Sequence, residues 1–146
     1  MKKNGDKIWK DDCLELFIDP REDGLKWGAK EDFQLGLSPG EWENEGRTWA
    51  WFQGVDPAVK KDVKLRISRV PEGYNLEARI SWKFLQITPR AGAVFGLTPA
   101  LHDMDLDGSE GKLTWFLLPD GKTGSLTLGQ AVLKGLSTAK KPAKAA

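Results

Sequence analysis

The sequence predicts an all-β protein, an antiparallel β-sandwich of the immunoglobulin or jelly-roll kind. Apolar residues recur at every second position in the main apolar segments, which is the period of a strand with one buried face. Turn-forming residues separate these segments at Pro39-Gly40, Pro71-Glu72-Gly73, Asp107-Gly108 and Pro119-Asp120-Gly121. A helical pattern is confined to one short turn at residues 81–85, around Trp82.

The first strand is expected at residues 12–19. Leu14, Leu16 and Ile18 form its aliphatic face, and Pro20 with the polar residues after it ends the alternation. The same pattern predicts further strands at residues 33–37, 63–67, 74–80, 93–97, 113–117 and 125–133.

One strand register follows from side-chain parity. The turn at residues 70–73 joins two strands whose apolar side chains must face the same side. That condition pairs Leu65 with Ala78 and Ile67 with Leu76. It also places Arg66 opposite Glu77, a favourable cross-strand pair. A slip by two residues would instead set Arg66 against Arg79, so the first register is expected.

Composition excludes several classes of protein. The 146 residues fit one domain, expected at residues 1–136, followed by a disordered tail at residues 137–146 that is rich in lysine and alanine. A single cysteine, Cys13, excludes an internal disulfide framework. The net charge of +1 argues against binding nucleic acid through its phosphates, and no apolar run reaches membrane-spanning length.

Tryptophan is unusually frequent, with seven residues against one tyrosine. Some of these indoles must be exposed, and an exposed indole usually contacts a flat, apolar-faced ligand or partner. Glu15 lies mid-strand on the non-aliphatic face, where a carboxylate is costly without solvent, a partner or a ligand. Trp9 lies six residues upstream. A strand carboxylate with a tryptophan at its rim is suited to binding sugars.

Two further aromatic positions each allow two interpretations. Trp115 shares a strand face with Leu113 and Leu117, which fits core packing, but it could also face Trp9 across a two-sided clamp for a sugar. Trp49 and Trp51 share a face, which fits either the packed face of an edge strand or a second aromatic platform.

The run Asp103-Met104-Asp105-Leu106-Asp107-Gly108 matches the first half of a calcium loop. Oxygen ligands at alternate positions can converge on a hard cation, and the glycine permits a sharp turn. An EF-hand would require glutamate at the twelfth position, where Thr114 stands, and no helical pattern flanks the run. Asp103, Asp105 and Asp107 are therefore candidate ligands of a structural Ca²⁺, with a solvated acidic turn as the alternative.

Catalysis is not expected. His102 is the only histidine, and no G-x-S-x-G motif supplies a serine nucleophile beside it. Glu15, Glu77 and Asp103 could in principle form the carboxylate pair of a glycosidase, but the chain offers no long active-site loop. A binding or structural role for His102 is the expectation.

The order of these motifs resembles the family 9 carbohydrate-binding modules and their wider relatives. The pattern D-x-x-E-x-x-x-D-P is met by Asp12, Glu15, Asp19 and Pro20. It is followed by Asp32-Phe33-Gln34, by Gly73, Tyr74, Glu77, Ile80, Ser81 and Trp82, by His102, Asp103 and Asp105, and by Trp115 with Gly124-Ser125-Leu126-Thr127-Leu128. Ser81 replaces the proline usual in that family.

The resemblance implies a β-sandwich, often with structural calcium, that holds a saccharide between Trp9 and Trp115 beside Glu15. Gln34 and His102 are further polar candidates for sugar binding. It also implies a non-catalytic module of a secreted polysaccharide-acting protein, and therefore an extracellular or periplasmic location if this chain is part of a longer one. No signal peptide is evident within it.

The strands that begin such domains precede the Trp9 region, so an N-terminal segment is expected to be missing here. The alternatives are a structural or interaction sandwich without a sugar ligand, and a haem-binding relative in which His102 or Met104 would supply the axial ligand.

Overall fold

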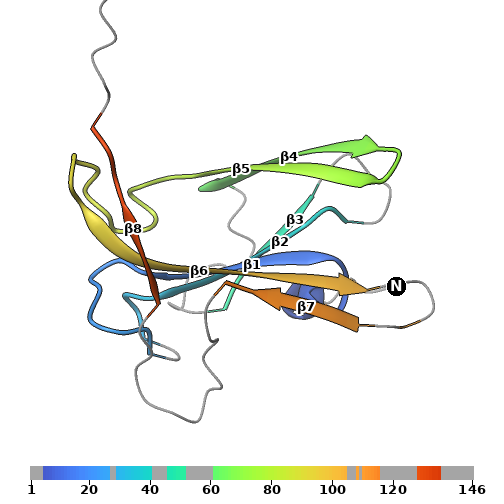
Figure 1. The fold of residues 1–146 in the computed structure, drawn as a ribbon, viewed down its shortest axis with the longest axis horizontal. Helices are drawn as coiled ribbons and strands as arrows, with labels where there is room; N and C mark the ends of the chain where they lie inside the picture. Colours follow the sequence, from blue (N-terminus) through green and yellow to red (C-terminus); the bar gives the residue numbers. More distant parts are fainter. Residues whose placement is uncertain are drawn as a thin grey trace, which may run out of the picture.

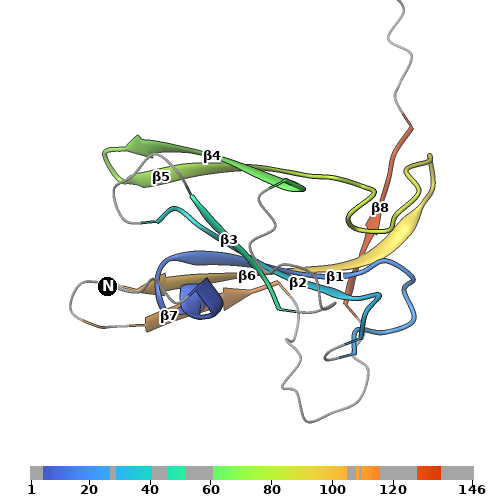
Figure 2. The same cartoon turned by 180° about the vertical axis from the view of Figure 1, so that it is seen from behind.

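The computed structural model describes residues 5–26, 29–40, 46–51, 61–104, 108, 110–115 and 128–135. Within them the chain forms two facing antiparallel sheets and one short 3-10 helix (Figures 1 and 2). The elements are η1 Gly5–Lys10, β1 Cys13–Asp19, β2 Phe33–Ser38, β3 Arg47–Ala50, β4 Val63–Val70, β5 Gly73–Ile80, β6 Val94–Met104, β7 Glu110–Thr114 and β8 Gly129–Val132. The predicted all-β sandwich is confirmed. The predicted tail at 137–146 lies outside the described residues.

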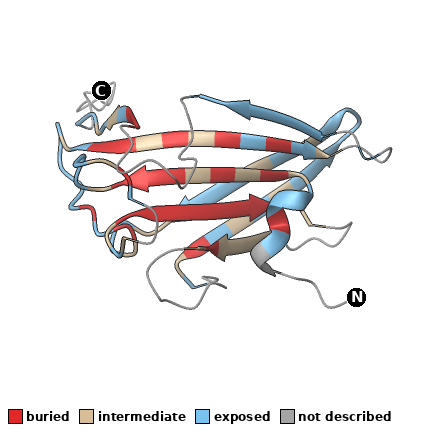
Figure 3. Cartoon of the chain, turned by 90° about the horizontal axis from the view of Figure 1, so that it is seen from below, coloured by how far each residue is buried: buried red, intermediate tan, exposed pale blue. Residues whose placement is uncertain are grey.

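The large sheet has the order β3-β2-β1-β6-β7, and β8 also pairs with β6. β1 lies at its centre, paired with β2 through Glu15↔Gly36 and with β6 through Glu15↔Ala100. Both faces of β1 are covered, and its non-aliphatic face is even more buried than its aliphatic one (Figure 3).

The hairpin β4–β5 forms the second layer (Figure 1). Its register pairs Leu65 with Ala78, Arg66 with Glu77 and Ile67 with Leu76, as parity predicted. The core between the layers consists of aliphatic and aromatic side chains from both sheets and from the turn after β5, among them Ile18, Phe33, Leu35, Leu37, Val63, Leu85, Ile87 and Phe95.

The opposite face of the large sheet is covered by η1, which packs against β1, β2 and β3 (Figure 2). Ile8 of η1 is completely buried there. A Cβ added to Gly36 would lie 2.5 Å from Cδ1 of Ile8 and 2.7 Å from Cη2 of Trp51. The absence of a side chain at Gly36 therefore lets the helix and Trp51 approach the sheet.

β6 is longer than the predicted strand at residues 93–97, because it continues through Pro99 to Met104. β8 pairs with β6 up to Leu97 and β7 begins pairing at Ala100, so Pro99 occupies the gap between the two partner strands. The missing N–H of Pro99 therefore interrupts little of the ladder. The predicted turn around Trp82 is present, and the Trp82 ring packs edge-on against Phe95 at 6.2 Å.

Candidate functional site

Three side chains that the sequence analysis singled out meet on the η1-covered face of the large sheet. We call Glu15, Gln34 and His102 the Glu15 cluster. Nε2 of Gln34 donates to Oε1 of Glu15 at 3.1 Å, and Nε2 of His102 lies 2.9 Å from Oε2 of Glu15. Glu15 is 4% exposed and His102 is 5% exposed. Both carboxylate oxygens of Glu15 are thus engaged inside the protein.

The strand register explains how the cluster forms. The residues directly opposite Glu15 are Gly36 on β2 and Ala100 on β6, which are both small. Gln34 and His102 are the diagonal neighbours on the same two strands, within reach of a long side chain. Glu15 can therefore extend across its small neighbours to both partners.

His102 keeps one atom of the cluster without a partner. Its Nδ1 is buried and forms no hydrogen bond with the residues that the structure describes. Each ring nitrogen of a histidine can donate or accept, depending on where the ring carries its proton. Burying Nδ1 without a partner is costly, and a ligand hydroxyl, which can both donate and accept, would satisfy it.

Trp9 lies on η1, which covers the same face, and it is 38% exposed. Ile8 anchors this helix to the sheet, while Nζ of Lys10 lies 5.3 Å from the centre of the Trp9 ring. Trp9 therefore offers an exposed indole on the element that closes the Glu15 cluster.

Trp115 is not placed with these residues. The backbone N–H of Trp115 donates to the carbonyl of Pro99 at 3.2 Å, directly after β7. Trp115 lines a cavity of about 370 Å³ with Leu14, Leu101 and Leu113. Leu14 and Leu101 project from the face of the sheet opposite Glu15. The structure therefore does not set Trp115 across a groove from Glu15. Because Trp115 is 72% exposed, the core-packing interpretation is wrong.

The proposed calcium loop is only partly described. Asp103 is exposed on β6, and Gly108 has a φ of +83°, a conformation that glycine adopts readily. Asp105 and Asp107 lie outside the described residues. Among the residues that are described, no group of three or more His, Cys, Asp or Glu side chains could hold a metal. The calcium site remains a prediction.

Other polar groups near β1 have structural roles. Asp19 accepts hydrogen bonds from the backbone N–H groups of Arg21, Glu22 and Gly24 and thereby closes the turn after the strand. Burial and the nearby Glu15 raise the pKa of the Cys13 thiol to about 12, so it stays protonated and unreactive, as expected for a buried cysteine.

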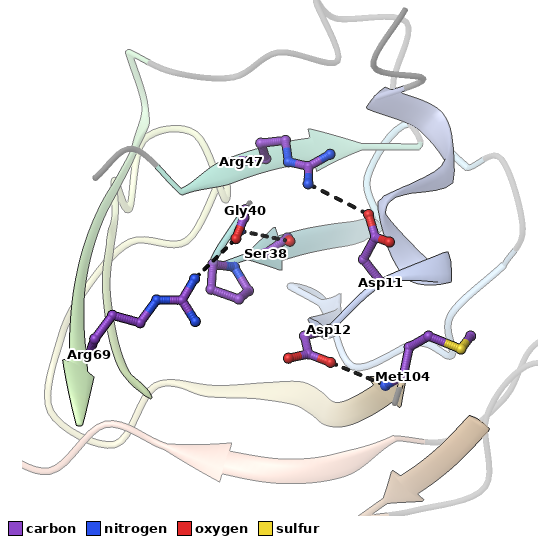
Figure 4. A pocket seen from close by; sticks show the side chains of 8 residues that line it. Asp11, Asp12, Ser38, Gly40, Arg47, Arg69 and Met104 are labelled. Carbon is purple, nitrogen blue, oxygen red and sulfur yellow. Dashed lines mark hydrogen bonds and ion pairs between the residues drawn. The ribbon is translucent and has the colours of Figure 1, made fainter. Parts of the chain in front are cut away.

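An open cavity of about 200 Å³ lies at one end of the sandwich, and the sequence analysis did not predict it (Figure 4). We call it the end cleft. It is lined by Asp11, Asp12, Ser38, Pro39, Gly40, Arg47, Arg69 and Met104. These residues come from the ends of five strands and their flanking loops, so only the acid pair before β1 could have drawn attention to it in the sequence.

The side chains of the end cleft are held by bonds to its walls. A terminal nitrogen of Arg47 lies 3.5 Å from a carboxylate oxygen of Asp11, and a terminal nitrogen of Arg69 donates to the carbonyl of Gly40 at 3.2 Å (Figure 4). Asp12 accepts the backbone N–H of Met104 at 3.1 Å.

The fold and these sites define a β-sandwich domain with polar groups clustered on one sheet face and at one end. The chain belongs to the carbohydrate family 9 binding domain-like family, whose family model matches residues 1–136. No curated protein matches the chain. None of the described helices is long and apolar enough to span a membrane.

The solved structures of similar fold include two family 9 carbohydrate-binding modules. One is a family 9 carbohydrate-binding module from Caldicellulosiruptor kristjanssonii in complex with cellotriose, with 20% identity, a TM-score of 0.62, and coverage of 91% of this chain and 63% of that one. The other is described as a family 9 module from the same organism in complex with glucose, with 21% identity, a TM-score of 0.63, and coverage of 92% and 64%. This chain therefore spans less than two thirds of the length of these structures.

Proposed function

We propose that this chain is a non-catalytic carbohydrate-binding module that binds a saccharide at Trp9 and the Glu15 cluster. The family match over residues 1–136 carries the proposal. The solved structures of similar fold support it, because those proteins hold cellotriose and glucose. The chemistry of the site agrees, since an indole can stack on the apolar face of a sugar ring while buried acceptors bind its hydroxyls.

A ligand can reach the Glu15 cluster only if part of the protein that covers it moves. The Glu15 cluster lies on the sheet face that η1 covers, and its three side chains are buried there. Ile8 of η1 is also buried against this face. We propose that a sugar first stacks on Trp9 and that a shift of η1 then exposes Nδ1 of His102 to a ligand hydroxyl. Trp115 is a second candidate stacking residue. To form the proposed clamp with Trp9, its ring would have to reach the sheet face that η1 covers.

Titration calorimetry with cellotriose tests this proposal, together with affinity electrophoresis through soluble glucans and xylans. Trp82 provides a matched control, because it has the same 38% exposure as Trp9. Trp9→Ala should weaken binding at least tenfold, consistent with a stacking residue worth roughly 2 kcal/mol. Trp82→Ala should leave binding unchanged.

Three results would count against the proposal. A wild-type chain that binds none of these saccharides would reject it, and equal binding by Trp9→Ala and wild type would remove Trp9 from the site. A haem band in the visible spectrum of the purified protein would favour the haem-binding alternative. Nε2 of His102 lies beside Glu15, so iron ligation through that atom would have to break this pair.

We also propose that the module is part of a longer secreted polysaccharide-acting protein and that Asp103, Asp105 and Asp107 bind a structural Ca²⁺. The alternating acids with Gly108 support the calcium proposal. Binding to the native state would raise the melting temperature in millimolar calcium relative to excess chelator. An unchanged melting temperature would favour the solvated acidic turn.

A further inference from the structure

We propose that the end cleft is a second, separate ligand site that binds the carboxylate of an acidic monosaccharide, a uronic acid. Only the saccharide class of this ligand rests on the proposed function. The cleft itself is defined by its cavity, its two arginines and its two aspartates.

Arg47 keeps one hydrogen-bond donor that the described residues do not satisfy. Nε of Arg47 is buried and forms no hydrogen bond with the described residues, although Arg47 lines the cavity. A guanidinium presents five N–H donors in a planar fork that matches a carboxylate. A turn of the Arg47 side chain toward the cleft would bring Nε to a ligand carboxylate and supply the acceptor that this atom lacks.

Asp11 already holds the place of such a carboxylate beside Arg47. Its ion pair with Arg47 is a single 3.5 Å contact, and the Asp11 side chain is 56% exposed against 22% for Arg47. An ion pair with so exposed a partner contributes little to stability. A ligand carboxylate with two good hydrogen bonds can therefore displace Asp11 at little cost to the fold.

The opposite wall of the cleft is preorganised. Arg69 reaches from β4 in the second sheet, donates to the carbonyl of Gly40, and lies 5.9 Å from the centre of the Tyr74 ring. Asp12 is oriented by the backbone N–H of Met104. Groups held in place before binding lose little entropy when a ligand arrives.

The charged side chains that line the end cleft indicate which class of ligand fits it. Two arginines and two aspartates leave the wall of the cleft close to neutral, so a bare anion gains little from the local field. A ligand that presents a carboxylate to Arg47 and Arg69 and hydroxyl donors to Asp12 uses both kinds of group. A cavity of about 200 Å³ has room for one sugar ring. A uronic acid meets these conditions.

Calorimetric or NMR titrations of the folded chain with glucuronate, galacturonate, glucose and acetate test the proposal. Wild type should bind a uronate at least tenfold more tightly than glucose or acetate. Arg47→Gln and Arg69→Gln should each weaken uronate binding at least tenfold, and Arg90→Gln, an exposed arginine outside the cleft, should have no effect. Asp11→Asn should strengthen uronate binding several-fold, because it removes the internal competitor for Arg47.

The increase expected for Asp11→Asn separates a ligand site from a structural ion pair, since loss of a structural pair would not improve binding. Uronate binding no tighter than that of glucose, equal binding of acetate, or unchanged binding by both arginine variants would overturn the proposal. Cellotriose titrations of the same variants keep the two proposals apart. Cellotriose binding without uronate binding rejects only the end cleft, and uronate binding that persists in Trp9→Ala confirms that the sites are separate.

Discussion

The two faces of the large sheet are both covered, but by different kinds of structure. One face packs aliphatic side chains such as Leu16 and Leu35 against the hairpin β4–β5. The other face carries the Glu15 cluster and is covered by η1, a helix of six residues. The first face is held by a broad apolar contact. The second combines the hydrogen-bonded Glu15 cluster with a separate apolar cluster that includes Phe17, Leu25 and Leu128, and with the contact that Ile8 of η1 makes.

The largest expected effect comes from breaking the polar cluster. His102→Ala removes one partner of a buried carboxylate and should lower the free energy of unfolding by about 3–5 kcal/mol. Denaturant unfolding measures the change. Glu77→Ala, which removes an exposed carboxylate on β5, is the control and should change stability by less than about 0.5 kcal/mol. Equal effects of the two variants would contradict a buried, bonded cluster.

A smaller effect is expected where η1 meets the sheet. Gly36→Ala would place a Cβ 2.5 Å from Ile8, so it should destabilise the protein by about 1–3 kcal/mol. Ile8→Ala creates space at the same point. The double variant should therefore be more stable than the sum of the two single changes predicts, as thermal or denaturant unfolding can show. Strict additivity would mean that Ile8 does not lie over Gly36.

Asp32 differs from the Glu15 cluster because it is a buried acid placed among other acids. The pKa of Asp32 is raised from 3.8 to about 6, mainly because the carboxyl is buried and also because Asp19 and other acids lie nearby. The hydrogen bond from the backbone N–H of Lys26 lowers the pKa and offsets part of this rise. The folded state therefore binds this proton more tightly than the unfolded state does. The stability from protonation is fully present below pH 3.8 and is lost as the pH rises through about 6.

The variant Asp32→Asn should remove this dependence. We expect it to raise the free energy of unfolding by about 1–2 kcal/mol at pH 7, because a unit of pKa shift corresponds to about 1.4 kcal/mol and the site relaxes in part. At pH 3.5 the variant and wild type should have equal stability. Parallel pH profiles for the two proteins, measured by urea unfolding, would show that Asp32 is not the group responsible.

The smallest effect is expected at Trp115. Its ring is 72% exposed on the face opposite Glu15, so Trp115→Ser should change stability by less than about 0.5 kcal/mol. A loss of several kcal/mol in denaturant unfolding would show that the ring packs against a further part of the protein. Cellotriose titration of the same variant tests whether Trp115 works with Trp9 in a clamp.

The β class, the strand positions near β1, β2, β4 and β5, and the register of the β4–β5 hairpin could all be predicted from the sequence. These features are local, because the two-residue period assigns each side chain to a face and a short turn restricts which residues can pair. The same period placed Glu15 on the non-aliphatic face of its strand.

The surroundings of that face depend on the tertiary structure. Glu15 meets His102, which is 87 residues away, only because β1 pairs with both β2 and β6. The pairing of β7 with β6 puts Leu113 opposite Leu101, and Trp115 lines the same cavity beside them, away from Glu15. The end cleft gathers Asp12 and Arg69 from different sheets. Pairing between distant strands depends on the packing of the whole chain, and a local pattern of apolar residues carries no information about it.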